Sequence, residues 1–194
     1  MTQARRLQIV LVLNLFMVAG LSIVGFSSHS LGVLAAGGDY LLDCSAIIFG
    51  LLAISFRNRN SEKSKATAVA ALLNVLLLLS ITITVTIEAT NRLINNAPKI
   101  HALPVLLISL LATGVMTMAA LILQDHGDDL HMRSVWLDTV ADAVSSAAIG
   151  VAAIIILVTN RFFWADSAVA ILISIAICYQ ALKLLREVLK SLTK

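Results

Sequence analysis

The stretch GGDYLLDCSAI, residues 37–47, places two aspartates, Asp39 and Asp43, inside a segment that is otherwise apolar. The segments on either side, SLGVLAA and IFGLLAISF, carry no charged residue, so the whole run is apolar enough to lie in lipid. An α-helix places residues i and i+4 on one face, so the two carboxyl groups lie one turn apart. No lysine or arginine occurs in this run to neutralise them.

The composition is that of an integral membrane protein. Of the 194 residues, 59% are hydrophobic and 13% are charged, whereas about a quarter of the residues in a soluble domain are charged. A helix needs about 20 apolar residues to cross the hydrocarbon core, and six stretches of this sequence have that length. We therefore predict an all-α membrane protein, a six-transmembrane-helix bundle in one domain over residues 1–194. The predicted spans are 7–28, 31–56, 66–93, 102–124, 132–159 and 165–190.

Lysine and arginine are distributed unevenly between the predicted loops. With the N-terminus in the cytoplasm, eleven of the 14 basic residues lie on the cytoplasmic side, and Arg92, Lys99 and Arg161 lie outside. An excess of basic residues is typical of cytoplasmic loops. We therefore expect a multi-pass protein of a bacterial inner (plasma) membrane, with both termini in the cytoplasm. The net charge of +3 is explained by this distribution, without a nucleic acid partner.

A second acid pair repeats the spacing of the first. The stretch WLDTVADAVSS of the fifth predicted span contains Asp138 and Asp142, again at i and i+4. Spans two and five run in opposite directions, so both pairs can reach one depth in the membrane. Four carboxylates there would provide hard oxygen ligands and negative charge for a divalent cation. A single intramembrane aspartate can instead be a helix cap or bond to Ser or Thr, but two pairs at one spacing favour a functional site.

Other polar residues offer weaker candidates. Asn14 in span one and Ser146 in span five can support the aspartates from neighbouring positions, or simply bond across helices. Helix capping suffices to explain Asp166 at the start of span six. The loop QDHGDDLHMR, residues 124–133, can form an acidic cytoplasmic entry, although a solvated loop that caps span five is the favoured interpretation. The candidate entry residues are Asp125, His126, Asp128 and Asp129.

The six spans with acid pairs in the second and fifth resemble the cation diffusion facilitator family of divalent-metal exporters. The stretch DDLHMRSVWLDTVADAVSSAAIGV resembles the segment that leads into and through the fifth helix of that family. FFWADSAVAILISIAI resembles the start of its sixth helix, IEATNRL the end of its third and VLNLFMV part of its first. The resemblance covers nearly all of the chain, and the fifth-helix stretch is its most specific part.

The resemblance implies a transport site made by Asp39, Asp43, Asp138 and Asp142. It also implies a homodimer in the lipid bilayer that exports zinc or a related metal from the cytosol in exchange for protons, without a prosthetic group. Many zinc-handling members have histidine as the first residue of one or both pairs, whereas all four residues here are aspartate. Oxygen ligands suit harder ions, so Mn²⁺ or Fe²⁺ gains weight beside Zn²⁺. The cytoplasmic metal-binding domain of the family is missing, either naturally or because the sequence is a shortened piece.

The sequence is compatible with two other functions. The acids could serve a proton- or sodium-coupled transporter of another cation, or the chain could be a non-transporting regulatory membrane subunit. An enzyme is not expected, because the sequence has no nucleophile–base set, no zinc-hydrolase motif and no nucleotide-binding loop. The two acid pairs are 99 residues apart, which favours two inverted three-helix halves with the site between them.

Overall fold

The computed structural model describes residues 3–56, 61–95, 97–124 and 130–192, and within them it contains six helices and no β-strand. The helices are α1 (Gln3–Ser28), α2 (Leu31–Phe56), α3 (Ser61–Ile94), α4 (Ala102–Leu123), α5 (Leu130–Thr159) and α6 (Trp164–Leu192). The predicted all-α fold is confirmed, and each predicted span lies on one helix. The sequence underestimates α3, which begins at Ser61 rather than residue 66. Hydropathy marks only the part of a helix that suits lipid, whereas a helix can continue through charged residues into water.

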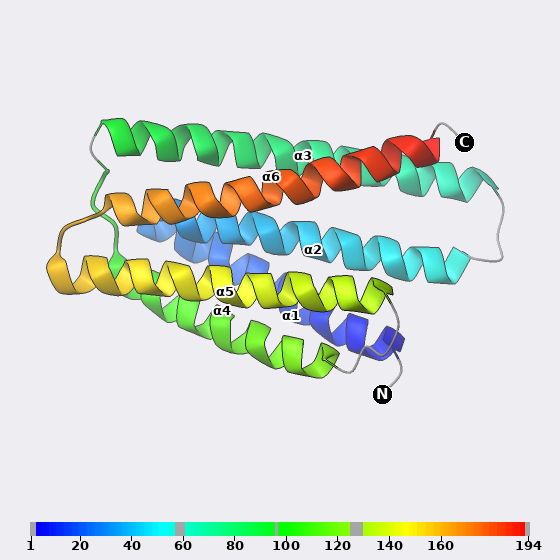
Figure 1. Ribbon diagram of the computed structural model, residues 1–194, viewed down its shortest axis with the longest axis horizontal. Coiled ribbons are helices and arrows are strands. Elements are labelled where there is room, and N and C mark those ends of the chain that lie inside the picture. Colours follow the sequence, from blue (N-terminus) through cyan, green and yellow to red (C-terminus); the bar gives the residue numbers. More distant parts are fainter. Residues whose placement is uncertain (1–2, 57–60, 96, 125–129, 193–194) are drawn as a thin grey trace.

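Five of the helices, all except α2, contain a described segment that is long and apolar enough to cross a membrane. The prediction that α2 also spans the membrane rests on its apolar sequence, and α2 runs lengthwise among the other helices (Figure 1). Many large apolar side chains are exposed on the outside of the bundle, including Phe16, Phe26 and Leu172. A soluble surface does not carry so many, because apolar area is driven out of water. The protein is therefore an integral, multi-pass membrane protein.

The helices lie roughly lengthwise beside one another, and α1 begins at the same end of the bundle at which α6 ends (Figure 1). We call this the terminal end, and we call the opposite end, which holds the α1–α2 and α5–α6 connections, the far end. Helix α2 packs against α1, α3, α5 and α6, while α4 packs against α1 and α5, and α3 against α6. The contacts α1–α4, α2–α5 and α3–α6 each join corresponding helices of the two predicted halves. The inverted relation between these halves stays a prediction.

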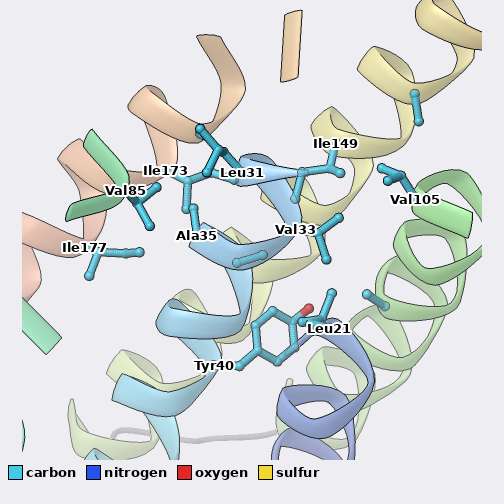
Figure 2. Packing of buried hydrophobic residues seen from close by; sticks show 14 of the residues in the cluster. Leu21, Leu31, Val33, Ala35, Tyr40, Val85, Val105, Ile149, Ile173 and Ile177 are labelled. Carbon is cyan, nitrogen blue, oxygen red and sulfur yellow. The ribbon is translucent and has the colours of Figure 1, made fainter. Parts of the chain in front are cut away.

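The buried apolar side chains form two separate clusters. The larger one, at the far-end side, includes Leu21, Val33, Tyr40, Ile149 and Ile173 (Figure 2). The smaller one, at the terminal-end side, consists of Leu7, Val10, Ile47, Ala119, Leu123 and Val135. Asn14, Asp43 and Asp142 fall between these two clusters, whereas other buried polar residues, such as Ser30 and Asp166, lie at the far end beside the larger one.

The turn between α1 and α2 is closely bonded at the far end. His29 adopts a positive φ of 56°, and the backbone N–H groups of His29 and Ser30 donate to the carbonyl oxygens of Phe26 and Gly25. This is the Schellman arrangement that ends a helix, here with histidine at the position that glycine usually occupies. Arg92 of α3 donates to the His29 carbonyl oxygen at 2.7 Å.

Asp166 of α6 completes the first turn of α2. Its carboxyl oxygens accept the backbone N–H of Leu31 at 2.7 Å and of Gly32 at 3.3 Å, and the Ser30 hydroxyl at 2.5 Å. Ser30 Oγ in turn accepts the N–H of Val33, so the first three N–H groups of α2 all have partners. A Cβ atom at Gly32 would lie 3.0 Å from Asp166 Oδ1, so glycine permits this close approach. Asp166 was predicted to cap a helix, and the helix that it caps is α2 rather than its own.

We predict that Asp166→Ala lowers the free energy of unfolding by about 2 kcal/mol, because it leaves buried N–H and O–H donors of α2 without an acceptor. The measurement is thermal unfolding of the purified protein in detergent. Ser27→Ala is the matched control, since the Ser27 hydroxyl is exposed at the same end and bonds only within its own helix. Equal unfolding midpoints for the two variants would contradict the assigned role of Asp166.

Candidate metal centre

The predicted aspartates lie in the middle of the bundle on two neighbouring helices. Asp39 and Asp43 project from α2 and are 6% and 8% exposed, and Asp142 on α5 is 2% exposed. Asp138, one turn nearer the terminal end of α5, is only partly buried. Because α2 and α5 pack together and run in opposite directions (Figure 1), the two pairs face one region from both sides.

The carboxyl groups interact across the α2–α5 interface. The side chain of Asp142 lies within hydrogen-bonding reach of both Asp39 and Asp43, and Asp138 acts electrostatically on all three. One oxygen of Asp142, Oδ2, is buried without a hydrogen-bond partner. Lys183 of α6 exerts a favourable charge interaction on Asp138. We call Asp39, Asp43, Asp138 and Asp142 the aspartate cluster.

The aspartate cluster is not a closed coordination cage in this structure. Among the described residues, no three His, Cys, Asp or Glu side chains are arranged to hold a metal ion as they stand. The donor types nevertheless suit a hard divalent cation, because all four are carboxylates and one buried oxygen is unpartnered. Binding would require the side chains to draw together around the ion.

A buried hydrogen bond joins α2 to α5 beside the cluster. The hydroxyl groups of Tyr40 and Ser146 lie 2.9 Å apart, and the two side chains are 0% and 1% exposed. Ser146 follows Asp142 by one helical turn, so this bond lies on the far-end side of Asp142. Sequence reasoning singled out Ser146 but missed Tyr40, whose position between two aspartates was the available signal.

Asn14 is buried in α1 at 1% exposure, and its Oδ1 atom has no hydrogen-bond partner. The predicted entry residues Asp125, His126, Asp128 and Asp129 lie outside the described residues, so their placement stays a prediction.

Glu88, an acid of α3, lies apart from the aspartate cluster and forms an ion pair with Arg92 at 3.0 Å.

The family model described as the cation efflux transmembrane domain matches residues 7–193. The chain belongs to the cation efflux family. This confirms the resemblance that the acid pairs and the fifth-helix stretch indicated.

A curated relative of the chain is the "Cadmium, cobalt and zinc/H(+)-K(+) antiporter" of Bacillus subtilis (strain 168). It is 26% identical over 184 residues, which cover 87% of this chain and 58% of the relative. The chain thus spans somewhat more than half the length of that relative. Family membership supports metal cation efflux transport, whereas the metal, the exchanged ion and the site are matters for proposal.

We predict that Tyr40→Phe and Ser146→Ala each lower the free energy of unfolding by about 1 kcal/mol, since each removes the same buried hydrogen bond. The double variant should lose clearly less than the sum of the two single losses, because the second change has no bond left to remove. Unfolding in a denaturing detergent series measures all four proteins. Ser80→Ala is the control, as this exposed hydroxyl bonds only to its own helix. Strictly additive losses would show that the two hydroxyl groups are not bonded.

Proposed function

We propose that the protein exports a divalent metal cation from the cytosol in exchange for protons, and that the aspartate cluster binds the cation during transport. The observation that carries this proposal is the burial of three carboxyl groups without a basic partner. Among the residues that the structure describes, the ion pair found is that of Arg92 with Glu88, so Asp39, Asp43 and Asp142 are not paired in this way. Such groups cost several kcal/mol in a membrane and are retained where they serve a function.

Proton exchange follows from the same burial. Carboxylates that crowd together away from water must be partly protonated or must share a cation. In our proposal the metal enters from the cytoplasmic side and displaces protons from the cluster. A rearrangement of the helices then opens the cluster outward, where protons replace the metal. Metal and protons compete for the same oxygens, and this competition couples their movements.

The proposal covers several metals. Zinc is supported by family membership, and the relative's name adds cadmium and cobalt. The oxygen ligands favour Mn²⁺ or Fe²⁺, because nitrogen and sulfur ligands are the usual preference of zinc. A transport assay that compares these metals directly decides between them.

The orientation and assembly belong to the same proposal. The terminal end of the bundle faces the cytoplasm of a bacterium, because the predicted connections at that end carry most of the basic residues. Two copies form a homodimer through their membrane helices. The alternatives are a proton- or sodium-coupled transporter of another cation, and a regulatory subunit without transport activity.

We predict that the purified protein in liposomes takes up one or more of Zn²⁺, Mn²⁺, Fe²⁺, Co²⁺ and Cd²⁺ when the lumen is more acidic than the bath. Protons leaving the lumen then drive metal inward. Asp43→Ala and Asp142→Ala should reduce the rate by about tenfold or more, because each removes a ligand of the site. Uptake is followed with a metal-sensitive dye inside the vesicles.

Glu88→Gln is the matched control, since it removes an acid of a neighbouring helix outside the cluster and should transport as the unchanged protein does. Metal uptake that persists in both cluster variants would refute the assignment of the site. Flux of potassium or sodium without any flux of a divalent metal would support the rival cation transporter. The absence of all flux would favour the regulatory subunit.

A further inference from the structure

Asn14 is a buried polar residue that the bundle itself does not satisfy. It is 1% exposed, and its carbonyl oxygen Oδ1 has no hydrogen-bond partner. Leaving a buried polar atom unpaired costs about 1–3 kcal/mol, and native structures rarely keep one without a reason. By contrast, Asn74 on α3 donates to Ser45 Oγ at 2.5 Å, so an asparagine elsewhere in this bundle does find a partner.

Asn14 belongs to the buried stripe of α1. The fully buried positions of this helix recur at intervals of three and four residues, and Asn14 stands between Val10 and Met17 on that stripe. Helix α1 packs along α2 and α4, so a side chain on this stripe points into the bundle rather than toward lipid. Leucine or valine would fill this position at lower cost.

The two apolar clusters show where Asn14 lies along the length of the bundle. On α1, Val10 belongs to the terminal-end cluster and Met17 to the far-end cluster. On α2 the boundary between the two apolar clusters falls between Leu42, which belongs to the far-end cluster, and Ile47, which belongs to the terminal-end cluster. Asp43 lies in this interval.

On α5 the boundary falls between Val135 and Ala143, which packs against the far-end cluster, and this interval contains Asp138 and Asp142. Asn14, Asp43 and Asp142 therefore occupy one polar layer, in which the unpartnered Oδ1 of Asn14 and the unpartnered Oδ2 of Asp142 both lie.

We propose that Asn14 Oδ1 is a further ligand of the transported cation, beside the aspartate cluster. The proposal rests on the function proposed above and extends its site to a third helix. An amide oxygen is a hard donor of the kind that binds divalent cations such as Ca²⁺ and Mn²⁺. It remains available in either protonation state of the acids, because the amide does not titrate.

The fifth donor has a consequence for metal choice. A set of up to five oxygens, one of them neutral, suits an ion that accepts high coordination numbers and oxygen ligands, whereas structural and catalytic zinc sites usually use four ligands rich in nitrogen and sulfur. Asn14 thus favours Mn²⁺ over Zn²⁺. It also connects α1 to the cation, so that binding draws α1, α2 and α5 together.

The test uses Mn²⁺ as the probe and the full chain in detergent. Protein made by cell-free synthesis with ¹³C-labelled asparagine is loaded with Mn²⁺, and electron–nuclear double resonance detects ¹³C nuclei close to the metal. The proposal predicts a ¹³C coupling of a directly bound amide, and this coupling should disappear in Asn14→Asp while Mn²⁺ still binds. A bound ion without any asparagine coupling would overturn the proposal.

Affinity provides a second readout that does not depend on labelling. Asn14→Leu should bind Mn²⁺ about tenfold or more weakly, whereas Asn14→Asp, which keeps an oxygen, should restore binding. Asn74→Leu is the matched control, because it removes a partly buried amide that already has a partner, and it should bind Mn²⁺ as the unchanged protein does. Equal affinities of Asn14→Leu and Asn74→Leu would refute the role of Asn14.

Failure of this inference is distinguishable from failure of the proposed function. If the unchanged protein binds and transports metal, Asp142→Ala abolishes both, and Asn14→Leu alters neither, the function stands and Asn14 is only a buried structural residue. If the unchanged protein binds no Mn²⁺ or other divalent metal, the proposed function fails and the inference fails with it.

Discussion

Carboxyl groups buried without basic partners are the constraint on which the rest of this bundle depends. Asp39, Asp43 and Asp142 gather where α2 meets α5, and their repulsion and desolvation oppose the packing of those two helices. The helices are held together on the far-end side by an extensive apolar cluster and by the Tyr40–Ser146 hydrogen bond. The cluster on the terminal-end side is much smaller. The stability of the interface therefore comes mainly from one side of the polar layer.

Two buried aspartates, Asp166 and Asp142, differ in how far the fold satisfies their carboxyl oxygens. Asp166 is 2% exposed, and both of its oxygens accept hydrogen bonds from the first turn of α2. Asp142 is equally buried, yet one of its oxygens has no partner and its neighbours are other acids. The burial is the same, but only Asp166 is satisfied by donors within the fold. An unsatisfied acid in a membrane needs a proton or a cation from outside, and this requirement is what the proposed transport function explains.

Much of the fold was predictable because hydrophobicity along a membrane helix is a local property, and so was the pairing of acids at i and i+4. The partner of Asp166 was not predictable, since Ser30 and Leu31 lie more than 130 residues away in the sequence and nothing local distinguishes a cap of α2 from a cap of α6. Tyr40 was missed for a related reason. Its place between Asp39 and Asp43 was a local signal, but an aromatic residue in an apolar run is also explained by packing alone. Only the approach of α5 shows that its hydroxyl has a partner.

The charge of the polar layer links the proposed metal to the proposed protons. Four ionised carboxylates exceed the charge of one divalent cation by two, and Lys183 offsets part of this excess at Asp138. When the metal leaves, the same layer would carry even more negative charge, which the low-dielectric interior does not tolerate. Protons that enter as the metal departs keep the charge of the layer nearly constant. A neutral donor such as Asn14 fits this scheme, because it adds a ligand for the metal without adding a charge that must be neutralised in the metal-free state. Under the proposed function, the burial of the acids would itself couple the metal to the protons, without a separate coupling device.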